Sequence, residues 1–132
     1  MTSPGRFDGK VVVVTGGETG IGRAVAQRCG REGASVTVAG IDAGNLKQTV
    51  ADLEGEGIKA LGAVTDVRDE GSIDRALDET VAAFGRIDAV HANAGIAGIR
   101  QDSVDLPVED WNQVIAVNLT GAFFTCGPAP AG

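Results

Sequence analysis

A cluster of glycines between a strand-like run and a helix-like segment is the part of this sequence best suited to chemistry. Residues 15–22 read TGGETGIG and follow four valines at positions 11–14. Gly16, Gly20 and Gly22 allow tight turns and let a charged group come close to the main chain. The start of the following helix offers unpaired N–H groups and the positive end of its dipole. This order predicts a site for the pyrophosphate of a dinucleotide, whereas the same glycines elsewhere would indicate only a turn.

Alternating strands and helices are expected to position this turn. Apolar runs predict strands at residues 11–14, 35–39, 60–64 and 87–91, and helical spacing of apolar residues predicts a helix after each of them. This alternation implies a parallel sheet with right-handed crossovers and helices on both faces. The predicted fold class is therefore α/β, a Rossmann-type doubly wound parallel sheet that is truncated after about four strands and four to five helices.

Single residues carry expectations about helix ends and the core. Ser72 is the expected N-cap of the third helix, and Gly85 is expected at its end. Trp111 lies on the apolar stripe of a last helix that starts near Val108, so we expect it in the core. His91 ends the fourth predicted strand, and we expect a core histidine with satisfied hydrogen bonds rather than a catalyst.

Composition limits the classes of partner. The 132 residues suit one domain, with a partial dinucleotide-binding (Rossmann) domain at 1–126 and a small-residue tail at 127–132. A net charge of −7 argues against nucleic acid and membrane surfaces as partners. The chain shows no signal-like or membrane-spanning run, so a cytoplasmic location is expected. Cys29 and Cys126 are expected to be reduced, and His91 is the single histidine, so we expect no metal site.

Four motifs in order resemble the short-chain dehydrogenase/reductase family over residues 7 to about 126. The TGGETGIG segment is similar to the family's phosphate-binding turn, and Asp66-Val67 looks like the pair that holds the adenine ring. Asn93-Ala94-Gly95 matches the last three residues of the family's NNAG motif, in which Ala92 replaces the first asparagine. Asn118 matches the asparagine of the family's active site.

The resemblance implies a catalytic role for Asn118 and a set of cofactor contacts on the other motifs. Each has a structural alternative, since Asp66 could simply cap a turn, Asn93 could tie loops together, and Asn118 could be a polar residue satisfied by backbone. The implied cofactor-binding residues are Gly16, Glu18, Thr19, Gly20, Ile21, Gly22, Ile41, Asp42, Asp66, Val67, Asn93, Ala94 and Gly95.

The acids near the end of the second strand favour NAD over NADP. A carboxylate there accepts hydrogen bonds from the adenosine ribose hydroxyls and repels a 2′-phosphate. NAD-preferring relatives place Asp where this chain has Gly40, and NADP-preferring ones often place Arg where it has Ile41. Asp42 and Glu18 are the acids nearby, and no cation accompanies them. Two cations elsewhere could still reach a 2′-phosphate, Arg23 and Lys47.

The resemblance implies an NAD(P)-dependent oxidoreductase that transfers hydride between nicotinamide and an alcohol or carbonyl substrate. The family's active site also needs a serine and a Tyr-x-x-x-Lys pair, but this sequence has no tyrosine, and its last lysine is Lys59. We therefore expect a fragment of such an enzyme that is inactive alone. The alternatives are an inactive NAD(H)-binding module and an interaction partner that pairs through an open sheet edge. An exposed edge at residues 87–91 would also favour self-association.

Overall fold

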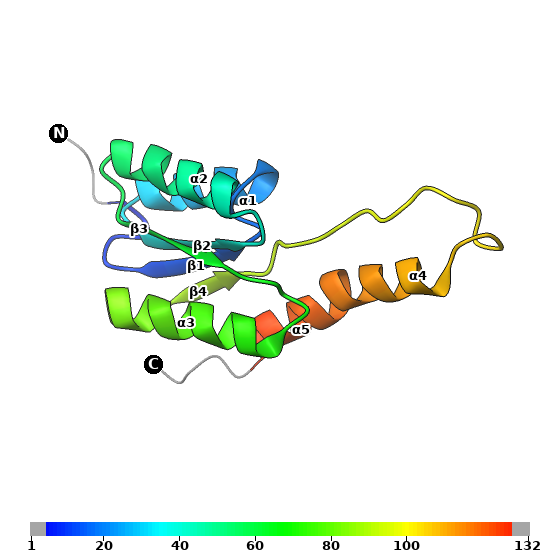
Figure 1. Cartoon of the computed structure of the whole chain (residues 1–132). Helices are drawn as coiled ribbons and strands as arrows, with labels where there is room; N and C mark the ends of the chain where they lie inside the picture. Colours follow the sequence, from blue (N-terminus) through cyan, green and yellow to red (C-terminus); the bar gives the residue numbers. More distant parts are fainter. Residues whose placement is uncertain (1–4, 128–132) are drawn as a thin grey trace.

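The chain folds into a parallel four-stranded sheet with helices on both faces, as the alternation of strands and helices predicts. The computed structural model describes residues 5–127, and the strand order is β3-β2-β1-β4. In Figure 1, α1 and α2 cover one face and α3 covers the other. The elements are β1 (Val11–Thr15), α1 (Gly20–Arg31), β2 (Ser35–Gly40), α2 (Ala43–Gly55), β3 (Ala60–Val64), α3 (Glu70–Phe84), β4 (Ala89–His91), α4 (Val108–Ile115), the π-helical turn η1 (Ala116–Thr120) and α5 (Gly121–Cys126).

The core lies in two layers on either side of β1. Val12 and Val14 pack with α1 and α2 residues in the larger cluster. Val13 points to the opposite face and packs with Ile73 and Leu77 of α3. Because β1 lies between β2 and β4 and is covered on both faces, all of its residues are buried, which explains the unbroken valine run.

The third helix begins three residues earlier than Ser72 suggested, so that prediction was wrong. Asp69 is the N-cap, and its carboxylate accepts a hydrogen bond of 3.0 Å from the Gly71 N–H. Ser72 lies inside the helix, and its hydroxyl accepts a 3.0 Å hydrogen bond from the Asp66 N–H. Asp and Ser are about equally good N-cap residues, and in this helix the upstream residue, Asp69, is the N-cap. Gly85 ends the helix with a φ of 84°, as predicted.

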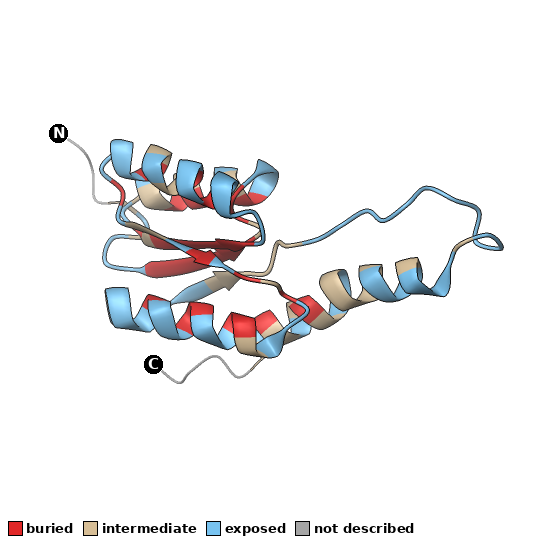
Figure 2. Ribbon diagram, in the orientation of Figure 1, coloured by how far each residue is buried: buried red, intermediate tan, exposed pale blue. Residues whose placement is uncertain are grey.

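Helix α4 extends beyond the sheet, and this overturns the prediction that Trp111 is in the core. The Trp111 side chain is 59% exposed, and α4 has no buried residue. Figure 2 shows the exposed surface of α4 projecting away from the buried sheet. The loop after β4 does contact this helix, since a Cβ on Gly98 would lie 2.7 Å from Val114 Cγ2, but within residues 5–127 it leaves Trp111 mostly uncovered.

The fourth strand is an edge of this sheet. Within the described part of the chain it pairs with β1 alone, and Ala89 is exposed. His91 differs from expectation, because its Nε2 atom is buried and has no hydrogen-bond partner among residues 5–127. The predicted boundary at residue 126 is the last residue of α5, whereas residues 128–132 of the predicted tail lie outside the described residues.

Glu32 ties the segment before β1 to the end of α1. Its carboxylate accepts hydrogen bonds from Arg6 Nε and Nη2, both at 2.6 Å, and from Arg28 Nε at 2.9 Å. The backbone N–H of Phe7 donates to the Glu32 carbonyl at 2.9 Å, and Phe7 packs against the larger core cluster. The hydrogen bonds from Arg6 and Arg28 lower the pKa of Glu32 from 4.5 to about 2.

This shift predicts a loss of stability in acid that depends on Glu32. Because the folded pKa is depressed, the contribution is complete above about 4.5 and is lost as the pH falls towards about 2. Urea unfolding across that range should therefore show a steeper fall for the wild type than for Glu32→Gln. Glu79→Gln, an exposed change on α3, serves as the control and should follow the wild type. Parallel curves for the wild type and Glu32→Gln would contradict the assignment.

Candidate functional site

The glycine turn packs against the segment after β4 with almost no free space. Gly16 and Gly20 have φ values of 63° and 57°, a region that favours glycine. A Cβ on Gly22 would overlap the Gly16 carbonyl oxygen and lie 2.5 Å from Asn93 Nδ2. A Cβ on Gly16 would lie 2.9 Å from Ala94 Cα. Larger residues at these two positions would force the turn away from the end of β4.

Hydrogen bonds fix the same contact. The Thr15 hydroxyl accepts from the Asn93 N–H at 3.0 Å and from the Ala94 N–H at 3.1 Å. Asn93 Nδ2 donates to the Gly16 carbonyl at 3.3 Å. The side chain of Asn93 therefore ties the two strand ends together, which is the structural alternative considered from the sequence.

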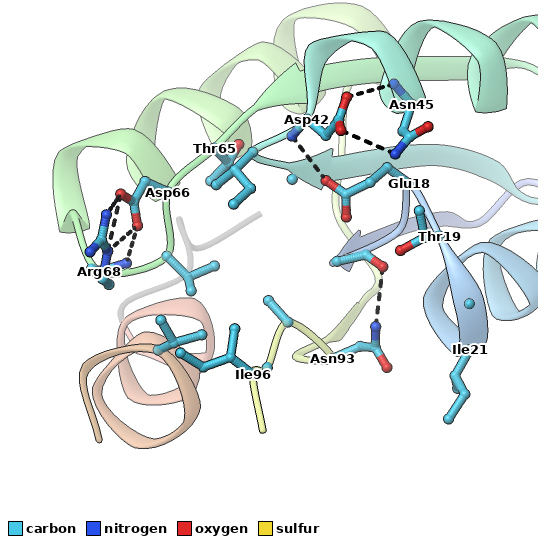
Figure 3. Close-up of a pocket in the computed structure, with 18 of the residues that line it drawn as sticks. Glu18, Thr19, Ile21, Asp42, Asn45, Thr65, Asp66, Arg68, Asn93 and Ile96 are labelled. Carbon is cyan, nitrogen blue, oxygen red and sulfur yellow. Dashed lines mark hydrogen bonds and ion pairs between the residues drawn. The ribbon is translucent and has the colours of Figure 1, made fainter. Parts of the chain in front are cut away.

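A cavity of about 550 Å³ opens at this edge of the sheet, where the carboxyl ends of the parallel strands meet (Figure 3). It adjoins the ends of β1 and β4, on either side of the point where the strand order reverses, which is where ligands bind in open α/β sheets. The structure brings all but one of the predicted cofactor contacts to the cavity wall. Those residues are Gly16, Glu18, Thr19, Gly20, Ile21, Ile41, Asp42, Asp66, Val67, Asn93, Ala94 and Gly95. The exception is Gly22, which is buried beneath the turn.

Several lining residues were missed from the sequence. Thr65 and Ile96 directly flank predicted motifs, so extending each motif by one residue would have found them. Arg68 and Gln113 come together only through the fold, where Arg68 Nη1 donates to Gln113 Oε1 at 2.8 Å. No sequence pattern predicts that these two residues pair. The other missed residues are Asn45 and Val117, and the wall also includes Gly40, which stands where NAD-preferring relatives place Asp.

Asp66 is held by its neighbour Arg68. Its carboxylate accepts from Arg68 Nη2 at 2.6 Å and from the Arg68 backbone N–H at 3.0 Å. The side-chain hydrogen bond from Arg68 lowers the pKa of Asp66, so the group remains a carboxylate near neutral pH. The turn-capping alternative for Asp66 is therefore present in the structure. The adenine contact stays a prediction.

Asn118 lies in the π-helical turn between α4 and α5 and holds the loop after β4. Its Oδ1 accepts from the Ile96 N–H and its Nδ2 donates to the Ile96 carbonyl, each at 2.8 Å. Both ends of the side-chain amide are thus used by backbone, as the structural alternative suggested. Asn118 does not line the cavity. Single π-turns inside helices often occur at functional sites, and the catalytic role of Asn118 stays a prediction.

Arg23 forms an ion pair with Asp52, and this contact joins α1 to α2. Neither Arg23 nor Lys47 lines the cavity. Among residues 5–127, no group of three His, Cys, Asp or Glu side chains could hold a metal ion. No helix in that part of the chain is both long and apolar enough to cross a membrane.

The order of the elements and the position of the cavity define a Rossmann-type α/β domain. The family model described as short chain dehydrogenase matches residues 10–129. The chain therefore belongs to the short-chain dehydrogenase/reductase family.

Relatives agree with this assignment. D-threitol dehydrogenase of Mycolicibacterium smegmatis is 36% identical over 121 residues, or 92% of this chain and 46% of the relative. (-)-trans-Carveol dehydrogenase of Rhodococcus erythropolis is 38% identical over 91% of this chain and 48% of its own length. A crystal structure of NAD+-bound xylitol dehydrogenase superposes with a TM-score of 0.87 at 34% identity, over 91% of this chain and 46% of that one. The chain thus spans about half the length of the relatives that it matches.

Removing the Thr15 hydroxyl should loosen the join between β1 and the loop after β4. Thr15→Val keeps the side chain's shape but leaves the Asn93 and Ala94 N–H groups without their acceptor, at a cost of about 1–3 kcal/mol. Hydrogen exchange should become faster at these two amides in the Val variant, whereas Thr15→Ser, which retains the hydroxyl, should protect them. Equal protection in both variants would show that the hydroxyl does not hold the loop.

Proposed function

We propose that this chain is the nicotinamide-dinucleotide-binding part of an oxidoreductase that transfers hydride between nicotinamide and an alcohol or carbonyl. The observation that carries the proposal is the cavity itself, which lies at the carboxyl edge of the sheet and is bordered by the glycine turn at the start of α1. This placement suits an anion that is bound by main-chain N–H groups.

The start of α1 supports this role, because its first amides have no side-chain partner. Thr19 is the N-cap but makes no side-chain capping hydrogen bond, and the first turn contains no acidic residue. In contrast, α2 and α3 are capped by the carboxylates of Asp42 and Asp69. The positive end of the α1 dipole is therefore available to a diphosphate.

The other motifs are assigned to the rest of the dinucleotide. We assign the adenine ring to the Asp66-Val67 segment, and the nicotinamide half to the segment from Asn93 to Gly95, both at the cavity wall. When bound, the nicotinamide ring supplies or accepts the hydride. This chain's own residues orient the cofactor and shield part of it from water.

NAD is the proposed cofactor in preference to NADP. Glu18 and Asp42 are the acids beside Gly40 and Ile41 at the cavity wall. The ion pair of Arg23 with Asp52 removes one of the two cations that could have met a 2′-phosphate. The NAD+ in the xylitol dehydrogenase structure is consistent with this preference.

Of the family's catalytic residues, we assign only Asn118 in this chain. These 132 residues contain no tyrosine and hence no Tyr-x-x-x-Lys pair, so we propose that the chain alone binds NAD(H) without turnover. The names of two relatives give substrates as different as D-threitol and carveol. We also propose a cytoplasmic location, with which the free Cys29 and Cys126 are consistent.

Calorimetric titration with NAD, NADH and NADPH tests the binding role. Gly22→Ala should lower NAD affinity at least tenfold, because the added methyl group overlaps the Gly16 carbonyl and reshapes the turn. Gly55→Ala is the matched control, since a Cβ there meets nothing within 4 Å. No binding of any of these nucleotides to the wild-type chain would overturn the proposed function.

Pairing with another chain is a second candidate role, favoured by exposed apolar residues and by the side of β4 that no other strand of residues 5–127 pairs with. Trp111, Leu119 and Phe123 are 59%, 64% and 70% exposed. Clustered exposed apolar side chains and open strand edges promote association. Sedimentation should therefore show species larger than a monomer, and Phe123→Lys should shift them towards the monomer. A monomer at all concentrations tested would exclude this role.

A further inference from the structure

A nearly buried carboxylate from the glycine turn lies at the end of β2. Glu18 is only 8% exposed, although its side chain is charged. A Cβ built on Gly40 would overlap Glu18 Oε2 and Cδ and lie 2.5 Å from Oε1. The Glu18 carboxylate therefore occupies the volume that any side chain at position 40 would need.

Two contacts hold Glu18 in this place, one from within α2 and one from Asp42, the N-cap residue of that helix. The hydroxyl of Thr49, which is fully buried, donates to the Glu18 carbonyl at 2.9 Å. The Asp42 N–H donates to Glu18 Oε2 at 3.4 Å. In Figure 3 the Glu18 side chain points into the cavity, below Asp42 and beside Thr65.

The neighbouring acid Asp42 is engaged elsewhere. Its carboxylate accepts from the Asn45 N–H at 2.9 Å and from Asn45 Nδ2 at 3.1 Å, so it caps α2. A capping carboxylate that turned towards a ribose would leave these donors of the first helical turn unsatisfied. Of the two acids beside the cavity, Glu18 is therefore the one that is free to meet a ligand.

The hydrogen-bonding capacity of Glu18 is mostly unused. A carboxylate has about four acceptor positions, and the 3.4 Å contact with the Asp42 N–H is the one hydrogen bond found for it among residues 5–127. No ion pair involves Glu18 in the same part of the chain. A ribose diol would supply two O–H donors, whereas a 2′-phosphate would place negative charge against a carboxylate that is shielded from water.

We propose that Glu18 selects a dinucleotide with a free adenosine ribose diol, and that Glu18 and Gly40 act as one unit. In this unit the selecting carboxylate comes from the glycine turn, and Gly40 leaves the space for it. This inference rests on the proposed dinucleotide site but assigns the selectivity to one residue. It also means that Asp42 does not select between NAD and NADP.

The first test compares three isosteric changes in the 132-residue chain by the ratio of its NAD and NADP affinities. Glu18→Gln keeps the shape but removes the charge, and it should lower the ratio at least tenfold, mainly by improving NADP binding. Asp42→Asn removes the charge of the competing acid and retains a good helix cap, so the ratio should change less than threefold. Glu79→Gln on the exposed face of α3 is the matched control for the Glu→Gln change.

The second test asks whether a side chain at position 40 displaces the Glu18 carboxylate from the volume that both would occupy. Gly40→Ala adds no charge but should displace the Glu18 carboxylate and lower the same ratio. In the Glu18→Gln background it should lower the ratio little further, because both changes act through one group. Glu18→Ser combined with Gly40→Asp should restore the preference for NAD by delivering the carboxylate from β2. A crystal structure of Gly40→Ala checks the displacement without any nucleotide.

The outcomes separate this inference from the proposed function. NAD binding with an unchanged ratio in Glu18→Gln would overturn the role of Glu18 and leave the dinucleotide site intact. An equal fall in Asp42→Asn would assign the selectivity to both acids and overturn it as well. If the Glu18 carboxylate has not moved in the Gly40→Ala structure, the proposal that Glu18 and Gly40 act as one unit is overturned. Failure of the wild-type chain to bind either nucleotide would overturn both proposals together.

Discussion

The hydroxyl of Thr15 joins two strand ends that are far apart in the sequence, and the cavity depends on this join. By accepting from the Asn93 and Ala94 N–H groups, it anchors the segment after β4 against the glycine turn. Asn93 in turn satisfies the Gly16 carbonyl. The polar groups beneath the turn are thus paired with one another. Within residues 5–127, the amides at the start of α1 receive no side-chain cap and remain available on the cavity side.

The features that sequence predicted well are those governed by local backbone chemistry and by periodicity. Four consecutive valines predicted a strand covered on both faces, and β1 is such a strand. The glycines of the turn were expected where the backbone must adopt positive φ or permit close contact, and Gly16 and Gly22 meet these demands. Most of the predicted contacts reach one cavity because parallel strands end at the same edge of a sheet.

The features that sequence predicted poorly depend on partners that no local pattern identifies. The apolar stripe of α4 suggested a buried Trp111, but a stripe shows only that a helix has an apolar face and not what covers it. Asp69 and Ser72 are both good capping residues, and in the structure Asp69 caps the helix while the Ser72 hydroxyl accepts a hydrogen bond from the Asp66 N–H, a contact that no local pattern predicts. Arg68 in the loop between β3 and α3 and Gln113 on α4 are 45 residues apart, and only the fold brings them into hydrogen-bonding distance.

Glu18 shows the same limit at the level of chemistry. The expected carboxylate position was at the end of β2, where the chain has glycine, and from sequence this looked like a missing or displaced acid. In space the position is filled, because the side chain of Glu18 reaches it from the neighbouring turn. Holding a carboxylate there with one long hydrogen bond is unfavourable in the absence of further donors. A ligand that brings two hydroxyl groups relieves this cost and gains affinity, whereas one that brings a phosphate increases it. In the proposed role, the same buried carboxylate would both attract the ribose diol and discriminate against the 2′-phosphate.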